Sequence, residues 1–330
     1  MTATLERVDV VRTTPAKGWS RSRARHRLTV LAFMAPAILG FALFFGYPLI
    51  ATIGFSFTKY DLINPPEWVG LENYAYMFSD KLFRTAVYNT LWFVVVLTIA
   101  RVVFALGVAS VIARLKTGVG LVRTLCYLPS LAPPVAATLV FFLVMRPNEG
   151  PLDAFLGWFG IESPLWFADP VWAKPGIAAV MLWVSGDLMI IVLAAILDVP
   201  QEQYEAAELD GAGPVRRWWH VTLPTISPVL MFGVVNSIIL ALQLFTQAVV
   251  AGSAASGSAD VTGSTKVLGF PENSTLTFPV WLYTQGFRYF DMGYAAAMAT
   301  VLFVISFAAT AVLVQRMRKA THQEEGGSGA

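Results

Sequence analysis

Long apolar stretches alternate with short polar ones along this chain. A helix that crosses the hydrocarbon core of a bilayer, about 30 Å thick, needs about 20 apolar residues, because every backbone polar group must be bonded within the segment. Six stretches are long enough, so the pattern predicts an all-α membrane protein with six transmembrane helices. The predicted spans cover residues 28–57, 86–113, 123–145, 176–197, 228–250 and 293–314.

Composition supports a membrane setting. The chain is 56% hydrophobic and 13% charged, and its mean hydropathy is +0.62, above what soluble domains show. Fifteen of the 23 Lys and Arg residues lie on the side of the two termini and seven on the other side, with Arg101 inside the second span. Because loops on the cytoplasmic side carry the excess of Lys and Arg, both termini are predicted to be cytoplasmic.

The chain has a polar segment at each end and an apolar domain between them. We predict a basic cytoplasmic tail at 1–27, a transmembrane domain at 28–319 and a flexible tail at 320–330, which ends in the sequence GGSGA. Whether that last sequence is native stays open.

The sequence shows no pattern of residues that is typical of catalysis. A single cysteine, Cys126, excludes an internal disulfide, and the three histidines have no metal-ligand spacing. The chain has no G-x-x-x-x-G-K-[ST] loop for phosphates and no paired acid and base, so we predict no catalytic residue, metal site or cofactor in it. A membrane-embedded enzyme is therefore the weakest of the readings.

Two charged residues lie near the middle of predicted spans. Arg101 and Asp187 would each cost about 2.5–3.5 kcal/mol alone, so they should face protein or water. They could pair with each other or contact a substrate, and the sequence leaves both alternatives open. Trp183, four residues before Asp187, would share its helix face, and an indole beside a carboxylate suits a sugar.

The fifth span carries three amides. Asn236, Gln243 and Gln247 fall on one stripe of a continuous helix, where they either bond neighbouring helices or line a pathway. Small residues then follow at 251–264, with too little apolar surface to pack, so we predict a mobile external loop there. Its role stays open.

Prolines interrupt the third span. Pro129, Pro133 and Pro134 remove helix hydrogen bonds and should kink or break it. Either a hinge or a fixed packing kink would result.

The polar loop at 198–226 carries the most specific signal. Asp198 and Pro200 indicate a helix start and Gly211 its end; a second helix can begin at Pro214 and stop at Pro224. The Arg-Arg-Trp-Trp sequence in the second helix could simply rest on the lipid surface. Carboxylates beside alanines in the first helix instead suit insertion into the groove of a partner protein.

This loop resembles the signature of the membrane subunits of bacterial binding-protein-dependent ABC importers. The spacing is E-A-A, three residues, G, nine residues, then Val221, one residue and L-P; isoleucine is usual where Val221 stands. The stretches GLENYAYMF and FRYFDMGYAAAMATVLF are similar to the carbohydrate branch, of the maltose and glycerol-phosphate type, over most of 28–319. The residues implied to couple to an ATPase are Glu205, Ala206, Ala207, Asp210, Gly211, Leu223 and Pro224.

The resemblance implies the type I importer permease fold, with the loop as a cytoplasmic two-helix coupling hairpin. It implies a bacterial plasma membrane location, a sister permease, two ATPase chains that bind ATP and Mg²⁺, and an external binding protein that delivers a sugar. An ion-coupled secondary transporter of small polar solutes is the alternative. The substrate, and whether the sister permease is identical to this chain, stay open. The residues that would form the pathway are Arg101, Trp183, Asp187, Asn236, Gln243 and Gln247.

Overall fold

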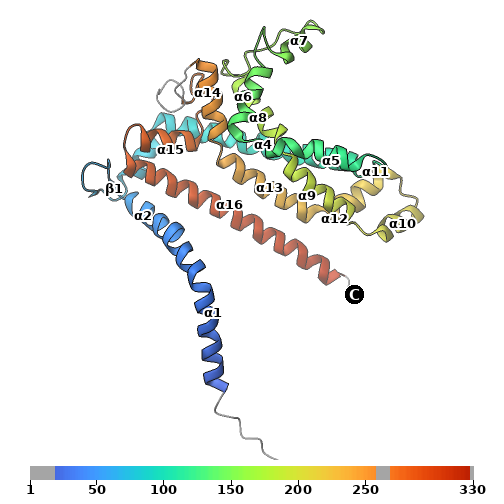
Figure 1. Ribbon diagram of the computed structural model, residues 1–330, viewed down its shortest axis with the longest axis horizontal. Helices are drawn as coiled ribbons and strands as arrows, with labels where there is room; N and C mark the ends of the chain where they lie inside the picture. Colours follow the sequence, from blue (N-terminus) through green and yellow to red (C-terminus); the bar gives the residue numbers. More distant parts are fainter. Residues whose placement is uncertain (1–18, 258–267, 328–330) are drawn as a thin grey trace, which may run out of the picture. The chain divides into compact units, whose positions relative to one another are not determined.

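The computed structural model describes residues 19–257 and 268–327, and side chains within 29–315 (Figure 1). The chain divides into two compact units, Met1–Gly54 and Phe55–Ala330. In the described residues, three helices are long and apolar enough to cross a membrane, and six spans result if each of three bent helix pairs counts as one. The predicted all-α membrane fold with six spans is confirmed.

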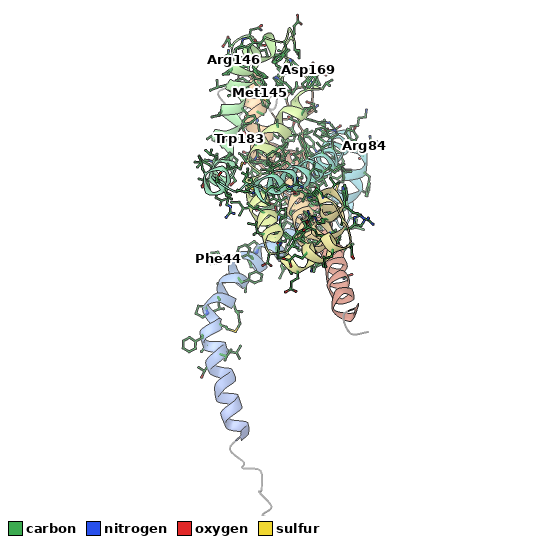
Figure 2. The ribbon with its side chains drawn as sticks, turned by 90° about the vertical axis from the view of Figure 1, so that its right-hand side faces the viewer. Phe44, Arg84, Met145, Arg146, Asp169 and Trp183 are labelled. Carbon is green, nitrogen blue, oxygen red and sulfur yellow. The ribbon has the colours of Figure 1, made fainter. Side chains whose placement is uncertain are left out.

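The first unit is a helical rod. It comprises α1 (Trp19–Phe41), a π-helical turn η1 (Ala42–Gly46) and α2 (Tyr47–Phe55). The candidate span in it, Thr29–Phe55, matches the first predicted span. Its apolar side chains include Phe44, which projects from the helix and is 77% exposed (Figure 2). Such a surface suits a lipid or protein environment.

In the second unit, the long helix α4 (Lys81–Ile112) packs against both α13 (Ser227–Leu242) and α9 (Gly186–Leu197). The last helix, α16 (Met292–Gly327), packs on α13. Small side chains make the close approach feasible: Ala105 and Ala109 are fully buried on α4.

The third span is broken, as its prolines predicted. It consists of α5 (Val119–Tyr127), a 3₁₀ turn η2 (Leu128–Leu131) and α6 (Pro134–Val144), and the path bends by 103°. Pro134 occupies the first position of α6, where its missing N–H costs no hydrogen bond.

The fourth span is also broken, which corrects our prediction of one continuous helix. Helix α8 (Ala173–Trp183) meets α9 at an angle of 49°. Gly186 starts α9 so close to the third span that a Cβ there would collide with the carbonyl oxygen of Cys126. Trp183 and Asp187 therefore lie on different helices and do not share one helix face as predicted.

The fifth span is shorter than predicted. Helix α13 ends at Leu242, and a separate helix, α14 (Thr246–Ser256), packs on α6. The prediction of one amide stripe is therefore wrong, because the helix that should carry it stops before Gln243. The predicted loop at 251–264 also begins too early: small residues let Ala251 and its neighbours pack inside α14, whereas 258–267 lie outside the described residues.

The second unit also contains several short elements. They are β1 (Thr58–Lys59), β2 (Glu67–Trp68), α3 (Glu72–Ser79), α7 (Pro151–Gly157) and α15 (Phe278–Phe287). Asp80 caps α4 and accepts hydrogen bonds from Trp281 Nε1 (2.8 Å) and Tyr294 OH (3.0 Å). One carboxylate thus joins α4, α15 and α16.

The C-terminal end of α16 reaches into the predicted tail. The helix continues to Gly327, through most of the segment that we predicted as a flexible tail. Most residues of 316–325, beyond the membrane span, are strong helix formers such as Arg and Glu, and no Gly or Pro occurs before Gly326, which favours a helix there.

Candidate functional site

The polar loop forms the two-helix hairpin that its motif predicted. Its first helix is α10 (Gln201–Leu209), and the second runs through α11 (Pro214–Arg217), the π-helical turn η3 (Trp218–Thr222) and α12 (Leu223–Thr225). Figure 1 shows α10 and α11 at one end of the second unit, with β1 and α15 at the opposite end.

The start of the hairpin differs in detail from the prediction. Asp198 follows the last turn of α9, where its N–H bonds to the Ala194 carbonyl, so it does not cap the next helix. Helix α10 begins at Gln201 without a side-chain cap, after Pro200. The proline had suggested the correct place, because it ends the preceding helix.

Gly211 ends α10 as predicted. Its φ of +75° is the left-handed conformation, which other residues adopt at a cost. The turn lets the Ala212 N–H reach the Ala207 carbonyl at 2.9 Å, so a carbonyl at the end of the helix gains a partner.

The second helix widens before its proline. The N–H of Leu223 bonds to the carbonyl of Trp218, five residues back, in the π-helical pattern. Pro224 has no N–H to continue an α-helix and would clash with the carbonyl four residues earlier, so the wider turn accommodates it. The same pattern precedes Pro48 in the first unit, where the Tyr47 N–H bonds to Ala42.

On one face of the hairpin, hydrogen bonds between side chains join its two helices. The hydroxyls of Tyr204 and Thr222 lie 2.9 Å apart, and Arg217 Nη1 donates to Glu208 Oε2 at 3.1 Å. Glu208, one of the carboxylates of the first helix that suited a partner's groove, is thus already bonded within the chain.

The other face of α10 is exposed. Glu205, Ala206, Asp210 and Gly211 are exposed, and Glu205 has no side-chain hydrogen bond or ion pair with any residue in the described part of the chain. Leu209 is 90% exposed beside them and was missed by the motif. The available signal was an apolar residue among carboxylates on a surface helix.

The last two motif residues lie in a different place. Leu223 is half-buried and Pro224 is exposed, and both belong to α12. They lie at the far end of the second helix, which then bends by 66° into α13.

The charged pair in the spans comes together. Arg101 Nη2 lies 3.0 and 3.2 Å from the two carboxylate oxygens of Asp187. The Arg101 side chain is 4% exposed and the Asp187 side chain 46% exposed. Arg101 Nε and Nη1 have no hydrogen-bond partner among the described residues.

The other pathway candidates are spread over three helices. Trp183 packs on Phe141 of α6, with ring centroids 5.3 Å apart, and is 41% exposed. Figure 2 shows Arg146 and Asp169 near one end of the second unit and Trp183 further from that end. The three amides are separated: Asn236 is half-buried in α13, Gln243 is exposed after it, and Gln247 is half-buried in α14.

Two buried hydroxyls within the membrane helices were missed. Thr98 on α4 and Ser237 on α13 have no hydrogen-bond partner for their side-chain oxygens within the described residues. Their signal in the sequence was weak, because hydroxyls in spans commonly bond to their own helix. No group of three or more His, Cys, Asp or Glu in the described part of the chain is placed to hold a metal ion.

Comparison with known proteins identifies the family. The model of the family "Binding-protein-dependent transport system inner membrane component" matches residues 102–319. The chain is 33% identical over 307 residues to the probable ABC transporter permease protein YesP of Bacillus subtilis, covering 92% of this chain and 95% of that one. It is 30% identical to the sulfoquinovosyl glycerol transport system permease protein SmoG of Agrobacterium fabrum, covering 88% and 91%.

A solved structure shares the fold. A chain in the crystal structure of a bacterial alginate ABC transporter, in complex with an alginate pentasaccharide-bound periplasmic protein, superposes with a TM-score of 0.76 at 20% identity, covering 91% of this chain and 97% of that one. Family model, relatives and fold agree, and the chain belongs to the binding-protein-dependent transport system inner membrane components.

Proposed function

We propose that this chain is the transmembrane subunit of an ATP-driven importer of a sugar or sugar-like solute, and that α10 couples it to ATPase chains. The observation that carries the coupling role is the exposed face of α10. It presents the motif residue Glu205, which has no partner in the described part of the chain, beside the exposed Leu209. An apolar side chain ringed by carboxylates suits a groove that contains a cation.

The orientation follows from charge. With both termini in the cytoplasm, the hairpin lies on the side where ATP is hydrolysed. ATP and Mg²⁺ bind to the partner chains, whose closure moves the hairpin. A sister permease and an external binding protein complete the complex.

The substrate class rests on the relatives and on the charged pair. The relatives include a lactose permease of Rhizobium radiobacter, 32% identical over 276 residues. A half-exposed carboxylate in a span is costly against lipid, so we propose that Asp187 faces the pathway or the sister permease. Arg101 then orients Asp187, and a carboxylate is a strong acceptor for sugar hydroxyls.

Reconstitution tests this function. The chain is co-purified with its ATPase chains, sister permease and binding protein, and uptake of radiolabelled sugars is measured in vesicles with and without ATP. The Glu205→Ala variant should lose ATP-dependent uptake by at least about tenfold, since a partnered charge is lost at an interface. Glu162→Ala, an exposed carboxylate outside the hairpin, is the matched control.

Two results would contradict the proposal. Uptake that follows an ion gradient and ignores ATP would establish the secondary transporter. ATP-dependent uptake that is unchanged in Glu205→Ala would remove the coupling role from α10.

A further inference from the structure

A cavity lies between the hairpin and the ends of the membrane helices. It measures about 350 Å³. A second hollow of about 320 Å³ adjoins the same side chains. The first is lined by Ser110, Arg114, Leu197, Tyr204, Arg217 and Trp218 among others. The second is lined by Ser110, Val111, Arg114, Val215 and Trp218. Arg114 and Trp218 thus border both spaces.

Arg114 is a cation without a counter-charge. No carboxylate oxygen in the described residues lies within 4.0 Å of its guanidinium, whereas the other cation of the cavity, Arg217, is paired with Glu208 at 3.1 Å. Arg114 is exposed, so a ligand can reach it. The cavity therefore offers a free guanidinium to an anion.

The indole beside it is fixed in place. Trp218 Nε1 donates to Ser110 Oγ at 3.2 Å, and that hydroxyl donates to the Leu106 carbonyl at 2.6 Å. This chain of bonds attaches the second helix of the hairpin to α4. The side chain of Trp218 is consequently a fixed wall of both spaces.

Both side chains lie near the end of a candidate membrane span. The candidate span of α4 is Lys81–Ile112, so Arg114 follows its last residue by two positions. In the second hollow, Val111 is 63% and Val215 is 70% exposed. The hollow thus has an apolar side next to the span and a cationic end outside it, with an indole at the boundary where Trp is enriched.

We propose that Arg114 and Trp218 bind the phosphate group of an anionic phospholipid, with its acyl chain along Val111 and Val215. The lipid would bridge α4 and the hairpin, so that lipid composition sets how firmly the hairpin is held. Basic pockets at the ends of membrane helices recognise such headgroups. Lipid binding at this site does not depend on the coupling role of the hairpin. If the hairpin does couple to an ATPase, the bound lipid would regulate that coupling.

Native mass spectrometry of the full chain tests the proposal. Delipidated protein in neutral detergent is titrated with phosphatidylglycerol, phosphatidylcholine or inorganic phosphate. The expected result is a phosphatidylglycerol adduct that phosphatidylcholine does not match and that millimolar inorganic phosphate does not displace. Arg114→Gln should weaken this adduct at least fivefold.

Matched variants keep the test decisive. Lys116→Gln removes an exposed cation that lines neither space and should bind as the original does. If Arg114→Gln does not fold, Arg114→Lys keeps the charge without the planar fork and should show a smaller loss. Equal binding of the two lipids, displacement by phosphate, or an unchanged adduct in the folded Arg114→Gln variant would overturn the proposal.

Discussion

At the scale of single residues, burial decides what the charged groups can do. Arg101 is almost wholly enclosed and touches Asp187 through one nitrogen, whereas Asp187 is open on one side. The pair is therefore asymmetric: the arginine belongs to the core, and the carboxylate has room for another partner. Glu205 and Glu208 show the same contrast on α10, since only Glu208 is bonded within the chain.

Removing one member of the charged pair should destabilise the chain. Asp187→Asn leaves a buried cation without its counter-charge, at a cost of about 3–5 kcal/mol for fully buried pairs and about 1–3 here because Asp187 is half-exposed. Thermal unfolding of the purified variants measures the loss. The double variant Arg101→Gln, Asp187→Asn should regain most of it.

The same variants separate stability from transport. If Asp187 contacts the substrate, the double variant stays inactive in uptake although its stability returns. Recovery of both together would make the pair purely structural.

Glu205 should contribute more to ATPase binding than Glu208. Truncation of a partnered charge at an interface costs about 2–5 kcal/mol, which corresponds to a loss of roughly 30-fold or more in affinity. Glu208→Ala should cost less, because its partner Arg217 is within the chain. Pull-down of the ATPase chains over a concentration series measures both; equal losses would contradict the distinction.

At the scale of elements, breaks in the helices position the sites. Gly211 closes α10 in a left-handed turn, and Gly186 lets α9 approach the third span. The proline breaks were predictable, because Pro has no N–H to continue the hydrogen bonding of a preceding helix. The break before α9 was not, since it depends on a contact with Cys126, distant in sequence.

Gly211→Val should strain the end of the hairpin. A β-branched residue in the left-handed conformation costs about 1–2 kcal/mol or more. We expect weaker ATPase binding in pull-down, while Gly211→Asn, which tolerates this conformation, stays close to the original. Gly213→Ala is the control, because Gly213 has an ordinary φ of −66°. Equal binding by all three variants would mean that the turn geometry is unimportant.

Gly186→Ala should disturb the contact between the two broken spans. The added methyl group meets the Cys126 carbonyl, and overpacking of this kind costs about 1–3 kcal/mol. Gly107→Ala on α4, where a Cβ meets nothing within 4 Å, should change stability by less than about 1 kcal/mol. Unfolding midpoints compare the two, and a smaller effect at Gly186 would show that the helices separate easily.

At the scale of the whole molecule, six spans and the hairpin were readable from the sequence. Both depend on local signals: the length of apolar stretches and the turn residues Gly211 and Pro214. The grouping of polar side chains was not readable, because Gln243 and Gln247 are separated by a helix end that lies inside an apolar stretch. After that end the chain forms α14, which packs on α6, a contact that the local sequence does not reveal.

Topology provides a prediction at this scale. In a Cys126→Ser background, a membrane-impermeant maleimide added to intact cells should label a cysteine at position 162 and leave one at position 205 unlabelled. The excess of Lys and Arg on the side of the hairpin is the physical reason. Labelling of position 205 from outside would show that the hairpin faces outward. That result would contradict the predicted orientation and the proposed coupling of the hairpin to an ATPase.

The contact between Gly186 and Cys126 has one more consequence. Cys126 supplies the only thiol in the sequence, and it lies where the third and fourth spans, both broken, touch each other. A fluorine label on this natural side chain would sit beside the joint of two bent helices. Its resonance during the ATP cycle would report whether the joint flexes or stays rigid, without the introduction of any residue.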